Sequence, residues 1–262
     1  MHIIDISWLR LFIGFIALII PAWILIYYKT RLVSKLLVST IRMTLQLLFV
    51  GYYLEYLFKL DNAWLNIGWM TVMIIVSDIA TIDRSEMKLK SLFIPVFIAT
   101  LLGIVITDFF FLGVVIRLQD VTTAQYLIPI TGMILGNCLR SNVIGIHAFY
   151  YSLNRNRSMY HYYLASGATR SEALFPFYTD ALKQVANPTL ATMATIGLVS
   201  LPGMMTGQIL SGSSPLTAIR YQIMIMIAIF SGTILTVFFA IKFMNPKVFD
   251  RADRFREEFL KE

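Results

Sequence analysis

The chain contains very little cysteine, histidine or charge. Its 262 residues include one cysteine, Cys138, and three histidines. A single thiol excludes an intrachain disulfide and a cysteine-rich metal site. Charged residues make up 14% of the chain and hydrophobic residues 58%, whereas soluble domains have roughly 25% and 45–50%. This composition excludes a soluble globular fold. An aromatic content of 14% excludes intrinsic disorder as well.

Sequence signatures of nucleotide binding and hydrolysis are also missing. No Gly-x-x-x-x-Gly-Lys-Ser/Thr phosphate loop is present, although such a loop is what holds a nucleoside triphosphate in many ATPases. Asp78 and Asp108 fall in apolar segments, and their expected depths in the membrane differ by roughly 20 Å. They are therefore not expected to act as the paired carboxylates of an intramembrane hydrolase. We expect no enzymatic activity and no bound cofactor in this chain alone.

Long apolar runs dominate the sequence instead. A bilayer core about 30 Å thick requires about 20 helical residues. Seven segments approach or exceed that length: residues 8–28, 39–58, 63–79, 92–115, 126–148, 190–210 and 219–241. The first segment follows Asp5, has no preceding lysine and lacks a cleavage site, so we expect it to remain in the mature protein.

The predicted fold is therefore an all-α polytopic membrane protein with about seven transmembrane helices. Residues 1–245 are expected to form the transmembrane domain, and residues 246–262 a cytoplasmic C-terminal tail. Seventeen of the lysines and arginines follow the odd-numbered segments, and four lie on the opposite side. Because cytoplasmic loops carry the excess of Lys and Arg, the N-terminus is predicted outside and the C-terminus inside. The net charge of +7 is explained by this topology, so no nucleic-acid partner is expected.

The connection spanning residues 150–187 is the long loop of the molecule. Thr169 followed by Glu172 fits a capping box. Apolar residues then recur at helical spacing up to Pro188, which is predicted to end the helix. A second helix over 157–166 is predicted to end at Gly167, because glycine adopts left-handed backbone angles at low cost. These helices could form a protrusion that docks another protein, or they could lie in the membrane interface.

Several motifs resemble those of a known transporter family. The segment Leu164-Ala165-Ser166-Gly167-Ala168-Thr169 resembles the glycine-centred loop with which ABC permeases contact their ATPase, although His161, Tyr162 and Tyr163 replace the Glu-Ala-Ala of importers. A closer resemblance is to the FetB family, the permease subunits of bacterial iron-export ABC transporters. It rests on Arg42 with Gln46, Leu47, Val50, Gly51, Tyr52, Leu54, Tyr56 and Phe58, on residues 128–130, 132–134 and 136–137, and on the near-continuous run 197–205 with Gly207, Pro215, 218–219 and 221–224.

This resemblance implies a permease homodimer in the bacterial plasma membrane with a separate ABC ATPase subunit, which would use the ATP. It implies iron or another metal as the exported substrate. It also implies that Gly167, Ala168, Thr169 and Glu172 couple to the ATPase. A stand-alone channel or receptor remains an alternative, as does an intramembrane hydrolase.

Polar and methionine residues within the apolar segments are candidates for the substrate pathway. Pro202-Gly203 is expected to break the sixth helix near the bilayer centre and to free backbone carbonyls. The predicted pathway residues are Asn137, Met204, Met205, Thr206 and Gln208.

Three further polar residues are expected inside the membrane: Arg42, Gln46 and Arg140. Arg42 could alternatively extend its side chain to the interface, and the methionines could be flexible packing rather than ligands. His147 is expected to pack rather than to bind metal. No set of metal ligands is predicted.

Overall fold

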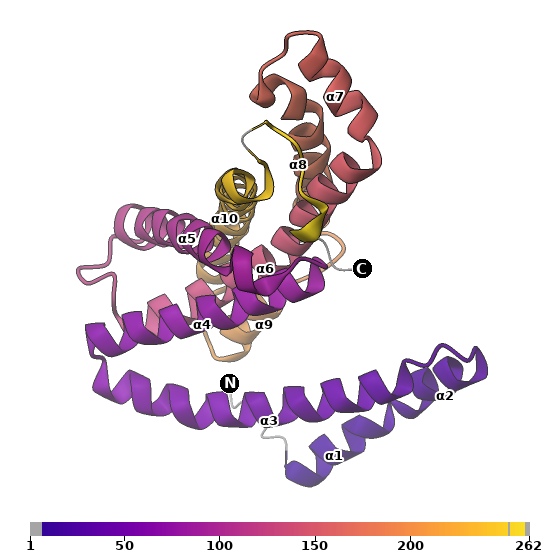
Figure 1. Cartoon of the computed structure of the whole chain (residues 1–262). Coiled ribbons are helices and arrows are strands. Elements are labelled where there is room, and N and C mark those ends of the chain that lie inside the picture. The colour runs from indigo at the N-terminus through magenta and orange to yellow at the C-terminus, as the bar shows by residue number, and fades with distance from the viewer. Residues whose placement is uncertain (1–6, 251, 260–262) are drawn as a thin grey trace. The chain divides into compact units, whose positions relative to one another are not determined.

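The computed structural model describes residues 7–250 and 252–259, and its regular elements in that part are helices joined by turns and irregular segments (Figure 1). The long helices are α3 (Val33–Leu60), α4 (Ala63–Arg84), α5 (Leu89–Asp108), α6 (Ala124–Arg155), α8 (Arg170–Thr195) and α10 (Pro215–Val248). The shorter ones are α1 (Trp8–Ile16), α2 (Ile19–Tyr27), α7 (Arg157–Ala165), α9 (Gly203–Leu210), the π-helix η1 (Phe109–Val115) and the 3-10 turn η2 (Glu257–Phe259). The described residues contain two isolated β-bridges and no strand. The all-α prediction is confirmed.

Six segments of the described chain are long and apolar enough to cross a membrane. They are Trp8–Tyr27, Val33–Leu60, Ala63–Arg84, Ser91–Val115, Ala124–Arg155 and Pro215–Val248. They coincide broadly with six of the seven predicted spans. The remaining one, residues 190–210, is divided between the end of α8, a non-helical stretch and α9.

The helix boundaries around Pro188 differ from the prediction. Helix α8 continues through Pro188 and ends at Thr195. A proline removes one backbone donor but does not stop a helix that tertiary contacts hold, and the buried residues Ala181 and Val185 of α8 lie in the preceding turns. The non-helical stretch between α8 and α9, residues 196–202, is called the break below. It starts at Ile196, six residues before the expected Pro202, and Gly197 accommodates it with a φ of +86°.

The chain divides into two compact units. One contains Met1–Leu60 and Leu210–Gly212, and the other contains Asp61–Ile209 and Ser213–Glu262. In the first unit α1 and α2 bury no residue, and α3 buries only Leu57. The second unit contains α4 to α8, most of α9, and α10, together with both hydrophobic cores.

Helix α10 is the central packing element of the second unit and contacts α5, α6 and α8. Small residues allow this close approach. A Cβ added at Gly103 of α5 would lie 2.5 Å from Thr236 Cγ2, and one at Gly145 of α6 would lie 2.6 Å from Val237 Cγ1. Small residues at helix contacts are typical of membrane proteins, where dispersion rather than water exclusion drives helix association.

Helices α6 and α10 contain 32 and 34 residues, which corresponds to about 48 and 51 Å at 1.5 Å per residue. Both exceed a bilayer core of about 30 Å. Their C-terminal ends carry α7, the start of α8 and the chain terminus, and we call this region the α7 end. Tyr150, Phe177 and Phe255 are buried in its core.

The predicted tail is part of this core. Helix α10 runs past residue 245 to Val248, and Phe249, Phe255 and Phe259 are all buried. The Tyr160 hydroxyl donates to the Asp253 carbonyl at 2.9 Å. The described tail residues therefore connect the end of α10 to α7.

Candidate functional site

The first candidate site is the turn between α7 and α8. Helix α7 spans Arg157–Ala165, and Gly167 follows with a φ of +90°. The backbone N–H of Ala168 donates to the Tyr163 carbonyl at 3.0 Å, and that of Gly167 donates to Leu164 at 3.0 Å. This is the glycine-terminated helix that the sequence predicts, since left-handed angles at a helix end strongly favour glycine.

The predicted capping box is present at the start of α8. The amide N–H of Glu172 donates to the Thr169 hydroxyl at 3.4 Å, and the Thr169 amide donates to a Glu172 carboxylate oxygen at 2.8 Å. The Thr169 hydroxyl donates to the same oxygen at 2.7 Å. The hydroxyl and then the amide of Thr169 lower the pKa of the Glu172 carboxyl. The turn therefore has a fixed conformation while remaining on the surface.

The amphipathic face of α8 is occupied by the chain's own core. Ala173, Leu174 and Phe177 are buried in the α7 end. The other face presents Ser171, Glu172 and Phe175 to the surface. The packed face is therefore not available to lipid or to a partner, and only the face with Ser171, Glu172 and Phe175 can meet a docking partner or the membrane interface.

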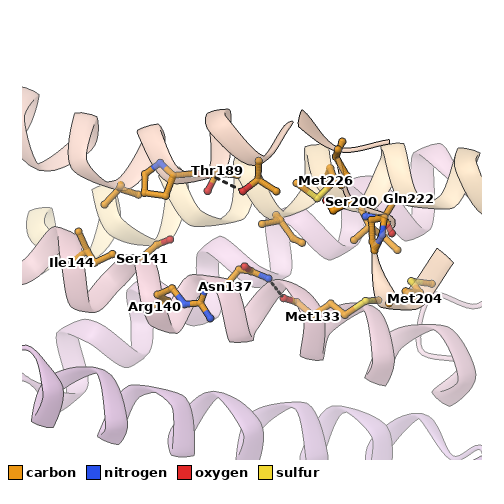
Figure 2. Close-up of a pocket in the computed structure, with 18 residues that line it drawn as sticks. Met133, Asn137, Arg140, Ser141, Ile144, Thr189, Ser200, Met204, Gln222 and Met226 are labelled. Carbon is orange, nitrogen blue, oxygen red and sulfur yellow. Dashed lines mark hydrogen bonds between the residues drawn. The ribbon is translucent and has the colours of Figure 1, made fainter. Parts of the chain in front are cut away.

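The second candidate site is a cavity of about 410 Å³ bounded by α6, α8, the break and α10 (Figure 2). All of its lining belongs to the second unit. The lining residues are Met133, Asn137, Arg140, Ser141 and Ile144 of α6, Val185, Pro188, Thr189 and Thr192 of α8, Ile196, Ser200 and Pro202 of the break, Gly203 and Met204 of α9, and Gln222, Ile225, Met226 and Ile229 of α10.

Arg140 is the sole ionisable side chain in that lining. Figure 2 shows it next to Asn137, on a neighbouring turn of α6. The Asn137 amide donates to the Met133 carbonyl at 2.8 Å, and the Thr192 hydroxyl donates to the Pro188 carbonyl at 2.9 Å. The cavity therefore combines one fixed positive charge with neutral polar groups and an apolar wall.

The structure separates the predicted pathway residues. Asn137 and Met204 line the cavity. Met205 is buried in α9, and the Thr206 hydroxyl donates to the Pro202 carbonyl at 3.1 Å. Neither of these two residues lines the cavity, and Gln208 does not line it either.

Sequence reasoning missed the contributions of α8 and α10. Thr189 and Thr192 were missed because α8 was expected to end at Pro188. Gln222 has apolar partners at i+3, i+4 and i+7, namely Ile225, Met226 and Ile229, and that helical spacing was a signal that could have identified this face of α10.

Arg42 and Gln46 lie on α3, which belongs to the other unit. Both are exposed there.

The two intramembrane aspartates each accept a hydrogen bond from a threonine. The Thr100 hydroxyl donates to Asp78 at 2.8 Å, and the Thr131 hydroxyl donates to Asp108 at 2.6 Å. Thr100 and Asp108 are eight residues apart on α5, so the two carboxylates differ in depth by about 12 Å along that helix rather than the roughly 20 Å expected. The sequence estimate assumed that the third span ends beside Asp78 and that the fourth begins at residue 92 on the same membrane edge, whereas α4 continues to Arg84 and α5 begins at Leu89.

His147 packs as predicted. Its ring stacks on Tyr151 with centroids 4.1 Å apart, and its Nε2 lies 3.8 Å from Glu86. Within residues 7–250 and 252–259, no group of three or more His, Cys, Asp or Glu side chains could hold a metal ion.

Comparison with known proteins identifies relatives along most of the chain. The model of an uncharacterised protein family, UPF0014, matches residues 8–249. The UPF0014 membrane protein slr1647 of Synechocystis sp. is 34% identical over 225 residues, covering 86% of this chain and 85% of that protein. The probable iron export permease protein FetB of Escherichia coli is 33% identical over 224 residues, covering 83% of each chain. Protein ALUMINUM SENSITIVE 3 of Arabidopsis thaliana is 29% identical over 231 residues, covering 85% of this chain and 83% of that protein. No solved structure matches.

These matches confirm the family resemblance inferred from the sequence motifs. They also support the expectation of a multi-pass membrane protein, since several relatives are named membrane proteins and six described segments have the length and apolarity of spans.

Proposed function

The chain belongs to the UPF0014 family of membrane proteins, and we propose that it is the membrane-spanning subunit of an ABC transporter that exports iron or another metal. In this proposal a separate ABC ATPase subunit binds and hydrolyses ATP. The name of the Escherichia coli relative, a probable iron export permease, supports the transport role and its direction.

The observation that carries the proposal is the continuity of α8. The helix starts directly after the exposed Gly167 turn, and its later residues Val185, Pro188, Thr189 and Thr192 line the cavity. From Arg170 to Val185 the helical rise is about 23 Å. A partner that moves the exposed turn would therefore displace the wall of the cavity, because a packed helix transmits displacement along its axis.

A homodimer is part of the proposal. Non-helical backbone at membrane depth is tolerated only where protein covers it or where it lines a water-filled cavity. The break follows α8 into the expected membrane region, yet Leu198 and Val199 are 90% and 80% exposed. A second copy of the chain would cover this apolar stretch, and the cavity beside it would then lie close to the subunit interface.

In the proposed cycle, ATP binding brings two ATPase subunits together and pushes on the two α7–α8 turns. Helix α8 then shifts against α6 and α10, which opens the cavity to the opposite side of the membrane. The break between α8 and α9 absorbs this movement because its residues make few contacts.

The test is to replace Gly167 by Val and by Asn. A Cβ at Gly167 would meet no atom within 4 Å, so the effect comes from the backbone, where a β-branched residue resists a φ of +90° and asparagine tolerates it. We expect Gly167→Val to insert normally but to lose co-purification with the ATPase and metal export. Gly167→Asn should retain most of both.

The outcomes separate the alternatives. Normal export and normal ATPase capture by Gly167→Val would contradict the coupling role of the turn. Export by the wild-type chain in cells that lack any co-purifying ATPase would instead support a stand-alone channel.

A further inference from the structure

The charge of the cavity indicates what it can bind. Among the residues that the structure describes, its lining contains no carboxylate, no imidazole and no thiol. Hard cations such as Mg²⁺ and other oxygen-preferring ions take carboxylate and carbonyl ligands, whereas imidazole suits iron and zinc. A bare iron ion would find a guanidinium in this cavity and no anionic ligand.

Arg140 lies in the middle of a membrane-spanning helix. It is sixteen residues from the start of α6, or about 24 Å along a helix of about 48 Å. Charged groups within a membrane-spanning segment are costly and usually have a partner. Within the part of the chain that the structure describes, no carboxylate forms an ion pair with Arg140. Arg140 is exposed in the single chain and lines the cavity, so a ligand can supply the missing negative charge.

Neutral polar groups line the same cavity as the guanidinium. Ser141 and Asn137 lie on the same helix, Thr189 and Ser200 come from α8 and the break, and Gln222 comes from α10. One amide hydrogen of Asn137 is used by Met133, which leaves the other amide hydrogen for a ligand. An arginine that shares a cavity with hydroxyl and amide donors can bind the oxygens of a carboxylate or a phosphate.

We infer that this cavity binds an anionic, oxygen-rich small molecule through Arg140, and that it accepts a metal only as the complex of such an anion. The inference rests on the proposed transport role for its physiological meaning. It changes the proposed substrate from a bare metal ion to an anion carrying carboxylate or phosphate groups, with or without a metal.

The test is equilibrium binding to the full-length chain purified in detergent. The probes are citrate, inorganic phosphate, ferric citrate, and Fe²⁺ kept reduced without a chelator. We expect ferric citrate to bind, metal-free citrate or phosphate to compete with it, and Fe²⁺ alone not to bind in the cavity. Arg140→Gln should weaken anion binding about 10- to 100-fold, since a charge-assisted hydrogen bond contributes about 1.5–3 kcal/mol.

Two further variants make the result specific. Arg140→Lys retains the charge but not the paired donors, so it should lose less affinity than Arg140→Gln. Arg220→Gln makes the same charge change on exposed α10 surface outside the cavity and should bind like the wild type.

Each outcome decides the matter. Tight binding of unchelated Fe²⁺, unaltered anion binding by Arg140→Gln, or binding of none of the anions at millimolar concentration would overturn the inference. Loss of anion binding in Arg140→Gln together with ATPase-independent transport would leave the anion site standing and remove the proposed ABC function. ATPase-dependent export of metal, together with normal anion binding by Arg140→Gln, would support the proposed ABC function and remove the anion site at Arg140.

Discussion

The α7 end and the region around the break are built in opposite ways. At the α7 end, Phe255 is buried. Its ring stacks with that of Tyr150, with centroids 6.1 Å apart, and the Arg157 guanidinium lies over it. Around the break, Leu198 and Val199 are almost fully exposed, and Gly197 has a positive φ that does not continue the helix. The difference indicates that the first region maintains a fixed shape, whereas the second can rearrange or accept a partner.

Ion pairs contribute little to the rigidity of the α7 end. Arg170 Nη1 lies 2.9 Å from an Asp253 carboxylate oxygen, but both side chains are about 40% exposed. Exposed pairs of this kind contribute about 0–1 kcal/mol. The aromatic residues of the tail provide most of the stabilisation, because burying a large ring removes far more apolar area from water.

The largest effect is expected from removing the tail's aromatic anchor. Phe255→Ala should lower the free energy of unfolding of the α7 end by about 3 kcal/mol, the lower part of the range for buried phenylalanine. Arg170→Gln, which breaks the ion pair to Asp253 and the cation–π contact with Phe249, should cost less, about 1–2 kcal/mol. Thermal unfolding in detergent measures both. Equal effects of the two variants would mean that charge, not packing, fixes this region.

A smaller effect is expected where α6 meets α8 and α10. A Cβ at Gly145 would lie 2.6 Å from Val237 Cγ1 and 3.1 Å from Val185 Cγ2, whereas one at Gly136 would meet nothing within 4 Å. Gly145→Ala should therefore destabilise the protein by about 1–3 kcal/mol through overpacking.

Gly136→Ala is the matched control on the same helix. It should be neutral or slightly stabilising, because alanine is the better helix former. Equal unfolding temperatures of the two variants would contradict the close packing of α6 against α10 at Gly145. If Gly136→Ala kept its stability but disrupted dimers, that result would place Gly136 at the proposed subunit interface.

The smallest effect on stability is expected in the cavity itself. Met204→Leu conserves volume and should cost less than about 1.5 kcal/mol. Export should persist if the thioether only packs, and it should fall if sulfur binds a soft metal.

Asn137→Ala removes a polar group from the same cavity and should impair export at similar stability. Metal retention in cells that express each variant measures this. Normal export by Asn137→Ala, with loss of export in Met204→Leu, would mean that the Met204 sulfur and not the Asn137 amide contacts the substrate. The cavity would then be a soft-metal site.

Local signals in the sequence were enough to locate the α7–α8 turn. Glycine at 167 and the Thr169–Glu172 pair act over three or four residues, and capping is decided by neighbouring backbone groups. Pro188 was also a local signal, but there the interpretation failed. The packing of α8 through Ala181 and Val185 outweighs one missing backbone hydrogen bond.

The composition of the cavity depended on contacts between distant residues. Asn137 and Met204, which were identified from polarity and from an expected break, line the cavity, whereas Met205 and Thr206 next to Met204 do not. Neighbours on a helix point in directions about 100° apart. Only the orientation of α9 in the packed unit decides which of them reaches the cavity.

By itself, the sequence determined that the chain is a multi-span helical membrane protein with a capped turn between two helices, because apolar length and capping are local properties. The tertiary structure decided that α8 joins that turn to a cavity, that the tail packs into the α7 end, and that Arg140 is the cavity's charge. These depend on which helix faces meet, and in a chain with few charges and many similar apolar residues, that choice is made by the fit of side chains such as Gly145 against Val237.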